Sequence, residues 1–507
     1  MILIHPPVAK PGEPPAGIAR LSGALGDHAV LHTVLDANIE GLLYLLKSPC
    51  PHVPDDAWTR RSFRNGLRNI EALKDAATYR HRDRYRKVVT ELGRVLEIVS
   101  KGSGATVGLA NYQHETLSPL RSTDLLSAAD RPESNAFYPY FRERLSGLVR
   151  QEMPRTIGFS LNFLSQAVCT FAMAGFLRRE FPDIRIVLGG GLVTTWLSNP
   201  LWRDPFSGLI DHYVSGPGEE KLLKFLGESR GRNTYIPDYS LMPLEEYLSP
   251  GFVLPYSASS GCFWRRCAFC PEKAEGNPYV PISADNVVSD LTTLSERTNP
   301  SLIHLLDNAV GVNVMQALAE RGPGVPWYGF ARVGRQLTDP DFCAMLKRSG
   351  CVMLKLGIES GDQGVLDRME KGVTIDMASR CLISLREAGI ATYVYLIFGT
   401  PAEDLRSARR TLDFVAAHGG QIDFLNLALF NMPVGSSTAT SLETRKFSEG
   451  DLSLYTDFVH PAGWDRRHAR TFLDTEFKRH PVIAEILRND PVVFTSNHAP
   501  FLVMNSR

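Results

Sequence analysis

Between residues 250 and 435 the chain alternates six short apolar runs with amphipathic helical patterns. The runs are VLPYSAS, SLIHLL, WYGFA, VMLKLGI, ATYVYLIF and IDFLNLALF. Runs of this length, rich in β-branched and aromatic residues, predict strands. Strands that alternate with helices run parallel, because each helix returns the chain to the edge where the preceding strand began. Six such units predict a partial (β/α)6 barrel, and in parallel barrels the chemistry lies at the carboxyl ends of the strands.

The preceding part of the chain, residues 1–235, also alternates strands and helices. Its strand-like runs include MILIHPP, TIGFSLN and IRIVLGGG, and the pattern predicts a doubly wound, Rossmann-like α/β domain. An arginine-rich insertion with helical periodicity, about residues 41–150, interrupts the alternation, and we interpret its arginines as a solvated face. After the barrel at 250–435 the alternation fades, so residues 436–507 are expected to form a mixed carboxyl-terminal segment.

The composition excludes several classes of partner. Lysine plus arginine equals aspartate plus glutamate, 55 against 55, so no global field attracts nucleic acid or an anionic membrane. No apolar run is long enough to span a bilayer, and the amino terminus MILIHPPVAK lacks the apolar region of a signal peptide. Five of the eight cysteines are scattered, which is not the pattern of a secreted disulfide framework. We therefore expect a cytoplasmic protein without a membrane span.

The other three cysteines, Cys262, Cys267 and Cys270, directly follow the first predicted barrel strand. Structural zinc sites normally take four ligands, and no second cysteine pair or histidine pair completes this group. A redox-active C-x-x-C motif would use Cys267 and Cys270 and leave Cys262 unexplained. Three thiolates without a fourth suit a [4Fe-4S] cluster that keeps one iron open to a ligand. Zinc and inert thiols remain the alternatives.

This loop resembles that of the radical S-adenosylmethionine (SAM) superfamily. The family spaces its cysteines by three residues and then two, with an aromatic residue before the last cysteine. Phe269 matches that aromatic residue, whereas the first gap here has four residues, FWRR. The resemblance implies a [4Fe-4S] cluster that binds SAM and cleaves it after one-electron reduction by a partner such as flavodoxin or ferredoxin.

Three further barrel residues resemble SAM-contacting positions of that family. Glu359 ends the fourth strand in the motif LGIESG, Asp307 closes the second strand, and Arg332 follows the third in FARV. The turn IFGTPAED after the fifth strand matches the family's glycine–proline turn. The alternative for Glu359 is a capping or salt-bridging carboxylate, and Asp307 and Arg332 could be polar groups satisfied within the fold.

The amino-terminal domain resembles the cobalamin-binding (B12) domain of one branch of the superfamily. That branch carries a Ser-x-Leu motif after its third strand and a glycine pair after its fourth, and glycines let the backbone approach the corrin tail. The residues implied in cobalamin binding are Pro7, Ser160, Asn162, Gly189, Gly190 and Gly191. The Asp-x-His-x-x-Gly motif of standard B12 domains is absent, so no histidine from that motif ligates cobalt.

Other interpretations of the amino-terminal domain follow from the same region. His5 is expected to order its loop by a hydrogen bond and not to bind cobalt. A dinucleotide site would need Gly-x-Gly-x-x-Gly after the first strand, which residues 5–13 do not provide, although Asp36 stands where a ribose-binding acid would. The remaining alternative is a scaffold that binds no corrin.

Together these resemblances imply a cobalamin-dependent radical SAM enzyme. The predicted reaction is methyl transfer to an unactivated carbon of a small molecule or natural-product intermediate. The alternatives are a radical rearrangement or cyclisation, with or without cobalamin, and a nonenzymatic iron–sulfur sensor. The sequence identifies neither the substrate nor a catalytic residue.

Overall fold

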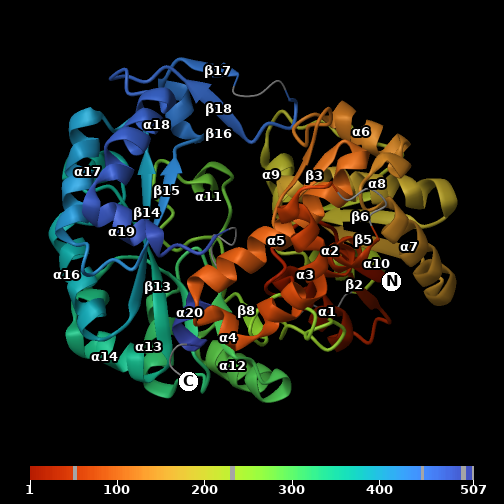
Figure 1. Cartoon of the computed structure of the whole chain (residues 1–507), viewed down its shortest axis with the longest axis horizontal. Helices are drawn as coiled ribbons and strands as arrows, with labels where there is room; N and C mark the ends of the chain where they lie inside the picture. Colours follow the sequence, from red (N-terminus) through yellow and green to blue (C-terminus); the bar gives the residue numbers. More distant parts are fainter. Residues whose placement is uncertain (50–53, 229–233, 447–449, 493–497, 505–507) are drawn as a thin grey trace. The chain divides into compact units, whose positions relative to one another are not determined.

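The computed structural model of the chain describes residues 1–49, 54–228, 234–446, 450–492 and 498–504 and divides into two compact units (Figure 1). The first unit takes in the described residues of Met1–Leu254, Glu449–Ser453 and Pro491–Arg507, and the second those of Pro255–Ser448 and Leu454–Asp490. The predicted carboxyl-terminal segment is thus shared between the two units. The domain limits at 235, 250 and 435 stay predictions.

The first unit is built on a five-stranded parallel sheet, which confirms the predicted doubly wound fold. In spatial order its strands are β2 (Thr33–Asp36), β1 (Ile2–His5), β5 (Thr156–Ser160), β6 (Arg185–Gly189) and β7 (His212–Val214). All residues of β1 and β5 are buried, as expected for a sheet covered on both faces. The strand order reverses between β1 and β5, and open α/β sheets bind ligands outside the carboxyl ends of their strands at this switch point.

Helices cover both faces of this sheet. They are α1 (Ala16–Asp27), α8 (Leu164–Glu180), α9 (Gly191–Ser198) and α10 (Glu219–Leu226). Residues 166–177 of α8 are all buried, because α8 also contacts two helices of the insertion, α6 (Ser122–Asp130) and α7 (Tyr138–Glu152). The continuous apolar run AVCTFAMAGFL therefore belongs to a helix that is packed on all sides.

The insertion is helical, with one short antiparallel ladder. Its remaining elements are α2 (Ala37–Lys47), α3 (Ala57–Lys74), α4 (Ala76–Tyr79), α5 (Arg82–Ser100), β3 (Ala105–Val107) and β4 (Tyr112–His114). The buried carboxylate of Glu91 on α5 accepts hydrogen bonds from Asn65 and Asn69 on α3, which ties these two helices together. Arginines such as Arg60 and Arg84 are exposed.

The second unit contains a six-stranded sheet of consecutive β/α units, as predicted for a partial barrel. In spatial order its strands are β15 (Phe424–Leu429), β14 (Ala391–Phe398), β13 (Cys351–Glu359), β12 (Trp327–Ala331), β11 (Leu302–Leu305) and β8 (Val253–Tyr256). The pairings from β11 to β15 are parallel. The connecting helices are α12 (Ala284–Thr298), α13 (Val312–Arg321), α14 (Pro340–Arg348), α16 (Ile375–Glu387) and α17 (Leu405–Ala417).

Within the second unit, the barrel is followed by a segment whose strands and helices no longer alternate. It consists of β16 (Met432–Pro433), β17 (Thr444–Lys446), β18 (Tyr455–Phe458), α18 (Arg466–Thr475) and α19 (Pro481–Arg488). The three strands form an antiparallel sheet in the order β16-β18-β17. The segment is fastened to the glycine–proline turn after β14, where His460 Nε2 lies 2.7 Å from the Thr400 carbonyl and the Trp464 indole donates to Glu403.

Within the part of the chain that the structure describes, no helix has the length and apolar character needed to cross a bilayer.

Close helix packing in the first unit generates a stability prediction. A Cβ atom on Gly175 of α8 would lie 2.0 Å from the backbone oxygen of Ala129 on α6. Gly175→Ala should therefore lower the free energy of unfolding by about 1–3 kcal/mol, because the two helices must separate. Gly147→Ala on α7 is the control, since nothing lies within 4 Å, and it should raise stability by about 0.5–1 kcal/mol. Urea unfolding followed by circular dichroism measures both, and equal effects of the two changes would refute the packing argument.

Candidate active site

The three clustered cysteines lie on a loop at the mouth of the barrel. The short strand β9 (Ser259–Ser260) follows β8 and pairs with β10 (Val280–Pro281), and the connection between them contains the helical turn α11 (Pro271–Ala274). Gly261 opens the loop with φ +71°, and a Cβ there would lie 2.3 Å from the Pro278 oxygen. The backbone crossing at the start of the loop therefore requires glycine.

The three loop thiols differ from the other cysteines in exposure. Cys262, Cys267 and Cys270 are half-buried, whereas the other cysteines within the described residues, Cys169, Cys343, Cys351 and Cys381, are buried. Cys50 lies outside the described residues.

Burial raises the pKa of the Cys270 thiol to about 11, and the backbone N–H groups of Glu272 and Lys273 oppose this shift. Burial also raises the pKa of Cys267, where the charges of Lys371 and Arg332 act in the opposite direction. Both shifts concern the free thiols, and a metal that binds thiolates would displace their protons.

The unusual four-residue gap of the loop contains one residue in the left-handed region, Arg265, with φ +50°. The residue before it, Trp264, is directed at the barrel, where its indole nitrogen donates to the Glu370 carbonyl at 3.1 Å. The longer gap is visible in the sequence, but the contact of Trp264 is not, because an aromatic residue between cysteines carries no signal of its partner.

Arg332, which follows β12, connects the cysteine loop to the segment after α15 (Gln363–Arg368). Its guanidinium lies 3.8 Å from the centre of the Trp264 ring. It also donates to the carbonyls of Lys371 and Gly372. A Cβ on Gly372 would lie 2.3 Å from the Trp264 ring, so this contact depends on glycine. Arg332 is therefore engaged in positioning the loop; whether it also contacts SAM stays a prediction.

Glu359 ends β13 with φ +70° and forms an ion pair with Lys371, with 2.7 Å between Oε1 and Nζ. Only 9% of either side chain is exposed. The ammonium group also lies 5.5 Å from the centre of the Phe269 ring in the cysteine loop. The structure thus brings Glu359, Arg332 and Cys267 together around Lys371, a residue that the sequence did not identify because nothing in its spacing marks it as the partner of Glu359.

Asp307 lies behind the cysteine loop. Its two oxygens accept hydrogen bonds from the Ala258 backbone N–H at 3.0 Å and the Ser259 hydroxyl at 2.5 Å. Burial raises the pKa of this carboxyl group, and the two hydrogen bonds oppose that shift. Because both oxygens hold the strand end that precedes Gly261, this geometry favours the alternative that Asp307 is a satisfied structural group.

The donor set around the cysteine loop distinguishes between two kinds of metal centre. Among the residues that the structure describes, no three histidine, cysteine, aspartate or glutamate side chains are gathered closely enough to hold one metal ion. Three thiolates that bind three different irons lie further apart than three on one zinc ion, so this finding bears on a mononuclear site and not on a cluster. Three half-buried thiols on one loop, next to Lys371 and Arg332, fit an anionic iron–sulfur cluster.

A second group of predicted residues lies at the carboxyl edge of the five-stranded sheet in the first unit. The Asn162 side chain donates to the Ser160 hydroxyl at 3.1 Å and accepts from the Gly191 N–H at 3.0 Å. It thereby links the end of β5 to the start of α9. Gly190 has φ +110°, and a Cβ there would lie 2.3 Å from the Leu161 oxygen. The fold itself therefore requires this glycine, independently of any ligand.

The turn after β1 is held by side chains other than His5. Gln166 donates to the Pro6 carbonyl at 2.7 Å, next to Pro7, and Asn38 accepts from the Ala9 N–H at 2.8 Å. His5 is buried, which lowers its pKa, and its Nδ1 atom has no hydrogen-bond partner among the described residues. Nδ1 of His5 therefore makes no loop-ordering hydrogen bond with the described residues, and such a bond by this histidine stays a prediction.

Asp36 is not available to a ribose. Its Oδ1 atom accepts from the N–H groups of Asn38 and Ile39 at the start of α2, and its Oδ2 atom accepts from the Tyr247 hydroxyl at 2.6 Å. The side chain is buried. This use as a helix cap agrees with the absence of a dinucleotide motif.

The second unit combines a six-stranded partial barrel with a three-cysteine loop after the first strand of that barrel. This combination is typical of an enzyme domain whose reaction takes place at the carboxyl ends of the strands. Residues 256–415 match the family model described as the Radical SAM superfamily, so this part of the chain is a radical SAM domain.

Two curated relatives are similar to about 60% of the chain. A hopanoid C-3 methylase of Methylococcus capsulatus is 24% identical over 343 residues, 61% of this chain and 64% of the relative. An anaerobic magnesium-protoporphyrin IX monomethyl ester cyclase of Rubrivivax gelatinosus is 23% identical over 354 residues, 59% of this chain and 62% of the relative. The chain spans less than two thirds of the length of each of these relatives.

The fold resembles that of TsrM from Kitasatospora setae, a radical S-adenosylmethionine methyltransferase whose structure contains cobalamin and a [4Fe-4S] cluster. The TM-score is 0.53 at 16% identity, and the match covers 93% of this chain and 81% of TsrM. At this identity the likeness establishes the fold alone.

The contact between Gly372 and Trp264 generates a prediction for the loop. Gly372→Ala should displace Trp264 and lower the iron content of anaerobically reconstituted protein, because the cysteine loop loses its contact with the segment after α15. Gly276→Ala is the matched control: Gly276 also has positive φ, but nothing lies within 4 Å. Both changes carry the strain of a left-handed alanine, roughly 1–2 kcal/mol. Iron analysis of the two folded variants measures the difference, and equal iron content would contradict the prediction.

Proposed function

We propose that this chain is a cobalamin-dependent radical SAM methyltransferase acting on a small molecule. The observation that carries the proposal is the group of three half-buried cysteines on a loop at the mouth of the radical SAM domain, next to Arg332 and the Glu359–Lys371 pair. Cys262, Cys267 and Cys270 would hold a [4Fe-4S] cluster. Bound there, such a cluster supplies the electron that cleaves SAM to methionine and a 5′-deoxyadenosyl radical.

The residues around the loop support binding of both groups. The positive charges of Lys371 and Arg332 next to Cys267 stabilise thiolates. Glu359 lies at the end of β13, where its second oxygen can accept a hydrogen bond from the amino group or ribose of SAM while Lys371 holds the first. Because only 9% of either side chain is exposed, water competes weakly with such a contact.

The first unit supports cobalamin binding through the edge that contains Ser160, Asn162 and Gly191. This edge lies at the carboxyl ends of parallel strands next to the switch point, and Gly189 and Gly191 leave backbone there without side chains. Cobalamin would supply the methyl group for transfer. Because the only histidine at the end of β1, His5, is buried, no protein histidine is expected on cobalt.

The reaction class follows from the relatives, one of which is named a methylase and another a cyclase. Methyl transfer to an unactivated carbon is therefore the proposal, and oxidative cyclisation is the second candidate. We also propose a reducing cytoplasm as the location and a flavodoxin or ferredoxin as the electron donor, since the cluster must be reduced before SAM is cleaved.

The first prediction of this proposal concerns iron. Cys262→Ala, Cys267→Ala and Cys270→Ala should each prevent assembly of the cluster, which holds four irons in unaltered protein by the stoichiometry of a [4Fe-4S] centre. Cys343→Ala and Cys381→Ala are matched controls, because both thiols are buried outside the loop, and they should keep the iron. Iron analysis and absorption spectra after anaerobic reconstitution measure this. A triple variant with full iron, or stoichiometric zinc in native protein, would refute the proposed cluster.

The second prediction concerns cobalamin. Gly191→Val should fold, because a Cβ at this position makes only ordinary contacts of 3.7 Å or more with Asn162. It should weaken cobalamin binding at least tenfold, about 1.4 kcal/mol, by placing a branched side chain against the corrin tail. Gly26→Val on α1 is the control, since its surroundings are open. Gly190→Val is unsuitable, since Leu161 blocks any side chain at that position.

Equilibrium binding of cobalamin and electron paramagnetic resonance of bound cob(II)alamin test this prediction. The spectrum should lack nitrogen coupling from a protein histidine. Coupling would overturn the ligation claim and leave cobalamin binding intact. No binding to folded protein with its cluster present would remove cobalamin from the proposed reaction.

A further inference from the structure

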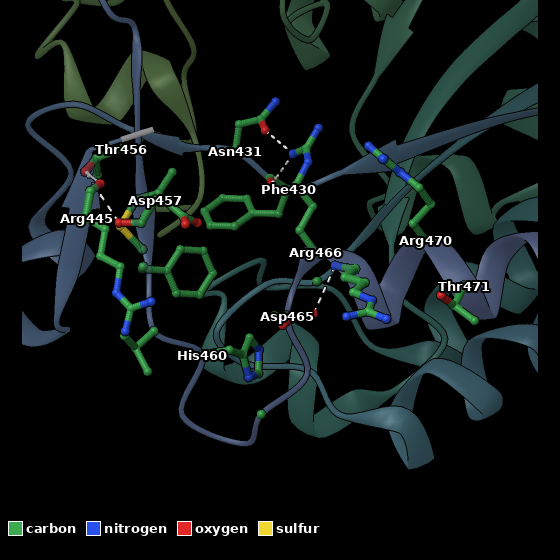
Figure 2. A pocket seen from close by; sticks show the side chains of 16 residues that line it. Phe430, Asn431, Arg445, Thr456, Asp457, His460, Asp465, Arg466, Arg470 and Thr471 are labelled. Carbon is green, nitrogen blue, oxygen red and sulfur yellow. Dashed lines mark hydrogen bonds between the residues drawn. The ribbon is translucent and has the colours of Figure 1, made fainter. Parts of the chain in front are cut away.

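A cavity of about 620 Å³ lies within the second unit (Figure 2). One side is formed by Gly399 and by Phe430 and Asn431, which directly follow β14 and β15. The other side is formed by β18 and α18 of the segment after the barrel. The cavity therefore lies at the carboxyl ends of the barrel strands but uses none of the cysteine-loop residues. Its volume is that of a site for a drug-sized molecule.

One wall of the cavity is cationic. Arg466, Arg467 and Arg470 project from one face of α18, while Ala469 and Phe472 on the other face are buried. Figure 2 shows Arg466 and Arg470 extending from the helix in the same direction. Residues three and four positions apart share a helix face, so in the sequence RRHARTF the third arginine, Arg470, lies on the same face as both Arg467 and Arg466.

Two acidic residues near this wall, Asp465 and Asp474, are engaged elsewhere, and a third, Asp457 on β18, lines the cavity. Asp465 caps α18 by accepting from the N–H groups of Arg467 and His468. Asp474, one turn beyond Arg470, forms an ion pair with Lys478 at 2.7 Å. Within the described residues no carboxylate lies at ion-pair distance from the side chain of Arg467 or Arg470, so both are available to an incoming anion.

Arg466 differs from these two arginines because it is fixed by the protein. Its guanidinium donates to the Phe430 carbonyl and the Asn431 side chain (Figure 2). Burial lowers the pKa of Arg466, the neighbouring charge of Arg470 lowers it further, and Asp457 opposes the shift. Two adjacent guanidinium groups repel each other, and an anion between or beside them offsets this repulsion.

The cavity also has an apolar wall. Phe430 and Phe458 meet edge to face with 5.9 Å between ring centres, and the buried Met432 lies next to them. A ligand that matches both walls has an apolar body and a negatively charged group. Guanidinium groups bind carboxylates and phosphates through paired N–H donors, which fixes the orientation of such a ligand.

The geometry points to this cavity as the binding site for the substrate, a small molecule with an apolar body and a carboxylate or phosphate group held by Arg467 and Arg470. Describing the ligand as the substrate rests on the proposed function. The anionic group lies against α18, and the apolar body lies against the ends of β14 and β15. The ends of β14 and β15 belong to the same six-stranded sheet whose first strand, β8, precedes the cysteine loop.

The test uses anaerobically reconstituted full-length protein and two probes, phenyl phosphate and phenylacetate, titrated by calorimetry. Both anions should bind, and the neutral phenylacetamide should bind more weakly. The double change Arg467→Gln and Arg470→Gln should weaken binding of the anions at least about tenfold. Arg406→Gln on α17, an exposed arginine outside the cavity, is the matched control and should bind as unaltered protein does. Arg470→Lys keeps the charge and should retain more affinity than Arg470→Gln.

The outcomes separate the cavity from the proposed function. Equal anion affinity in the double variant and in unaltered protein would overturn the assignment of the cavity. Tighter binding of one probe would identify its anionic group as that of the substrate. Formation of 5′-deoxyadenosine from SAM by unaltered protein is measured in parallel. SAM cleavage without arginine-dependent binding would refute the cavity alone, and arginine-dependent binding without iron or SAM cleavage would refute the proposed function alone.

Discussion

The guanidinium group of Arg332 holds together two loops that no strand pairing connects. It lies on the Trp264 ring of the cysteine loop and donates to the carbonyls of the segment that contains Lys371 and Gly372. A cation on an aromatic face contributes roughly 0.5–2 kcal/mol, depending on how far water is excluded. The cysteine loop has little regular structure of its own, so its position relative to Glu359 depends on this contact together with the hydrogen bonds of Trp264 to the Glu370 carbonyl and of the Ala268 N–H to the Met369 carbonyl.

Parallel strands impose the same organisation on both units. Their carboxyl ends meet at one edge, so residues from distant parts of the sequence gather there without further folding information. In the first unit Asn162 secures this edge by joining Ser160 to the start of α9. In the second unit, the edge is secured by the ion pair of Glu359 with Lys371, by the contact of Arg332 with the Trp264 ring and by the close packing of Gly372 on that ring. Each edge is thus a rigid support for loops whose own conformations are irregular.

The strands and the thiols could be predicted because their signals are local. Apolar runs identify strands, and cysteines five and three residues apart identify a shared loop. Contacts such as Trp264 with Arg332 could not be predicted, because they depend on how two loops meet after the barrel has formed. The arginines of α18 also become a cavity wall only when Trp464 fastens the segment to Glu403. Asp307 and Gly190 resemble ligand-binding positions in sequence, yet their surroundings give each a role in the fold.

The helix α20 (Ala499–Met504) belongs to the first unit although the whole second unit precedes it in the chain. Phe501 packs on Tyr79 and Tyr85 with ring centres 5.1 and 4.9 Å apart, and Arg80 donates to the Met504 carbonyl. A ribosome makes the barrel before it makes Phe501. While the barrel is being synthesised, the nascent first unit therefore has two tyrosines that Phe501 does not yet cover, and this part of its core closes only after the whole second unit has been made.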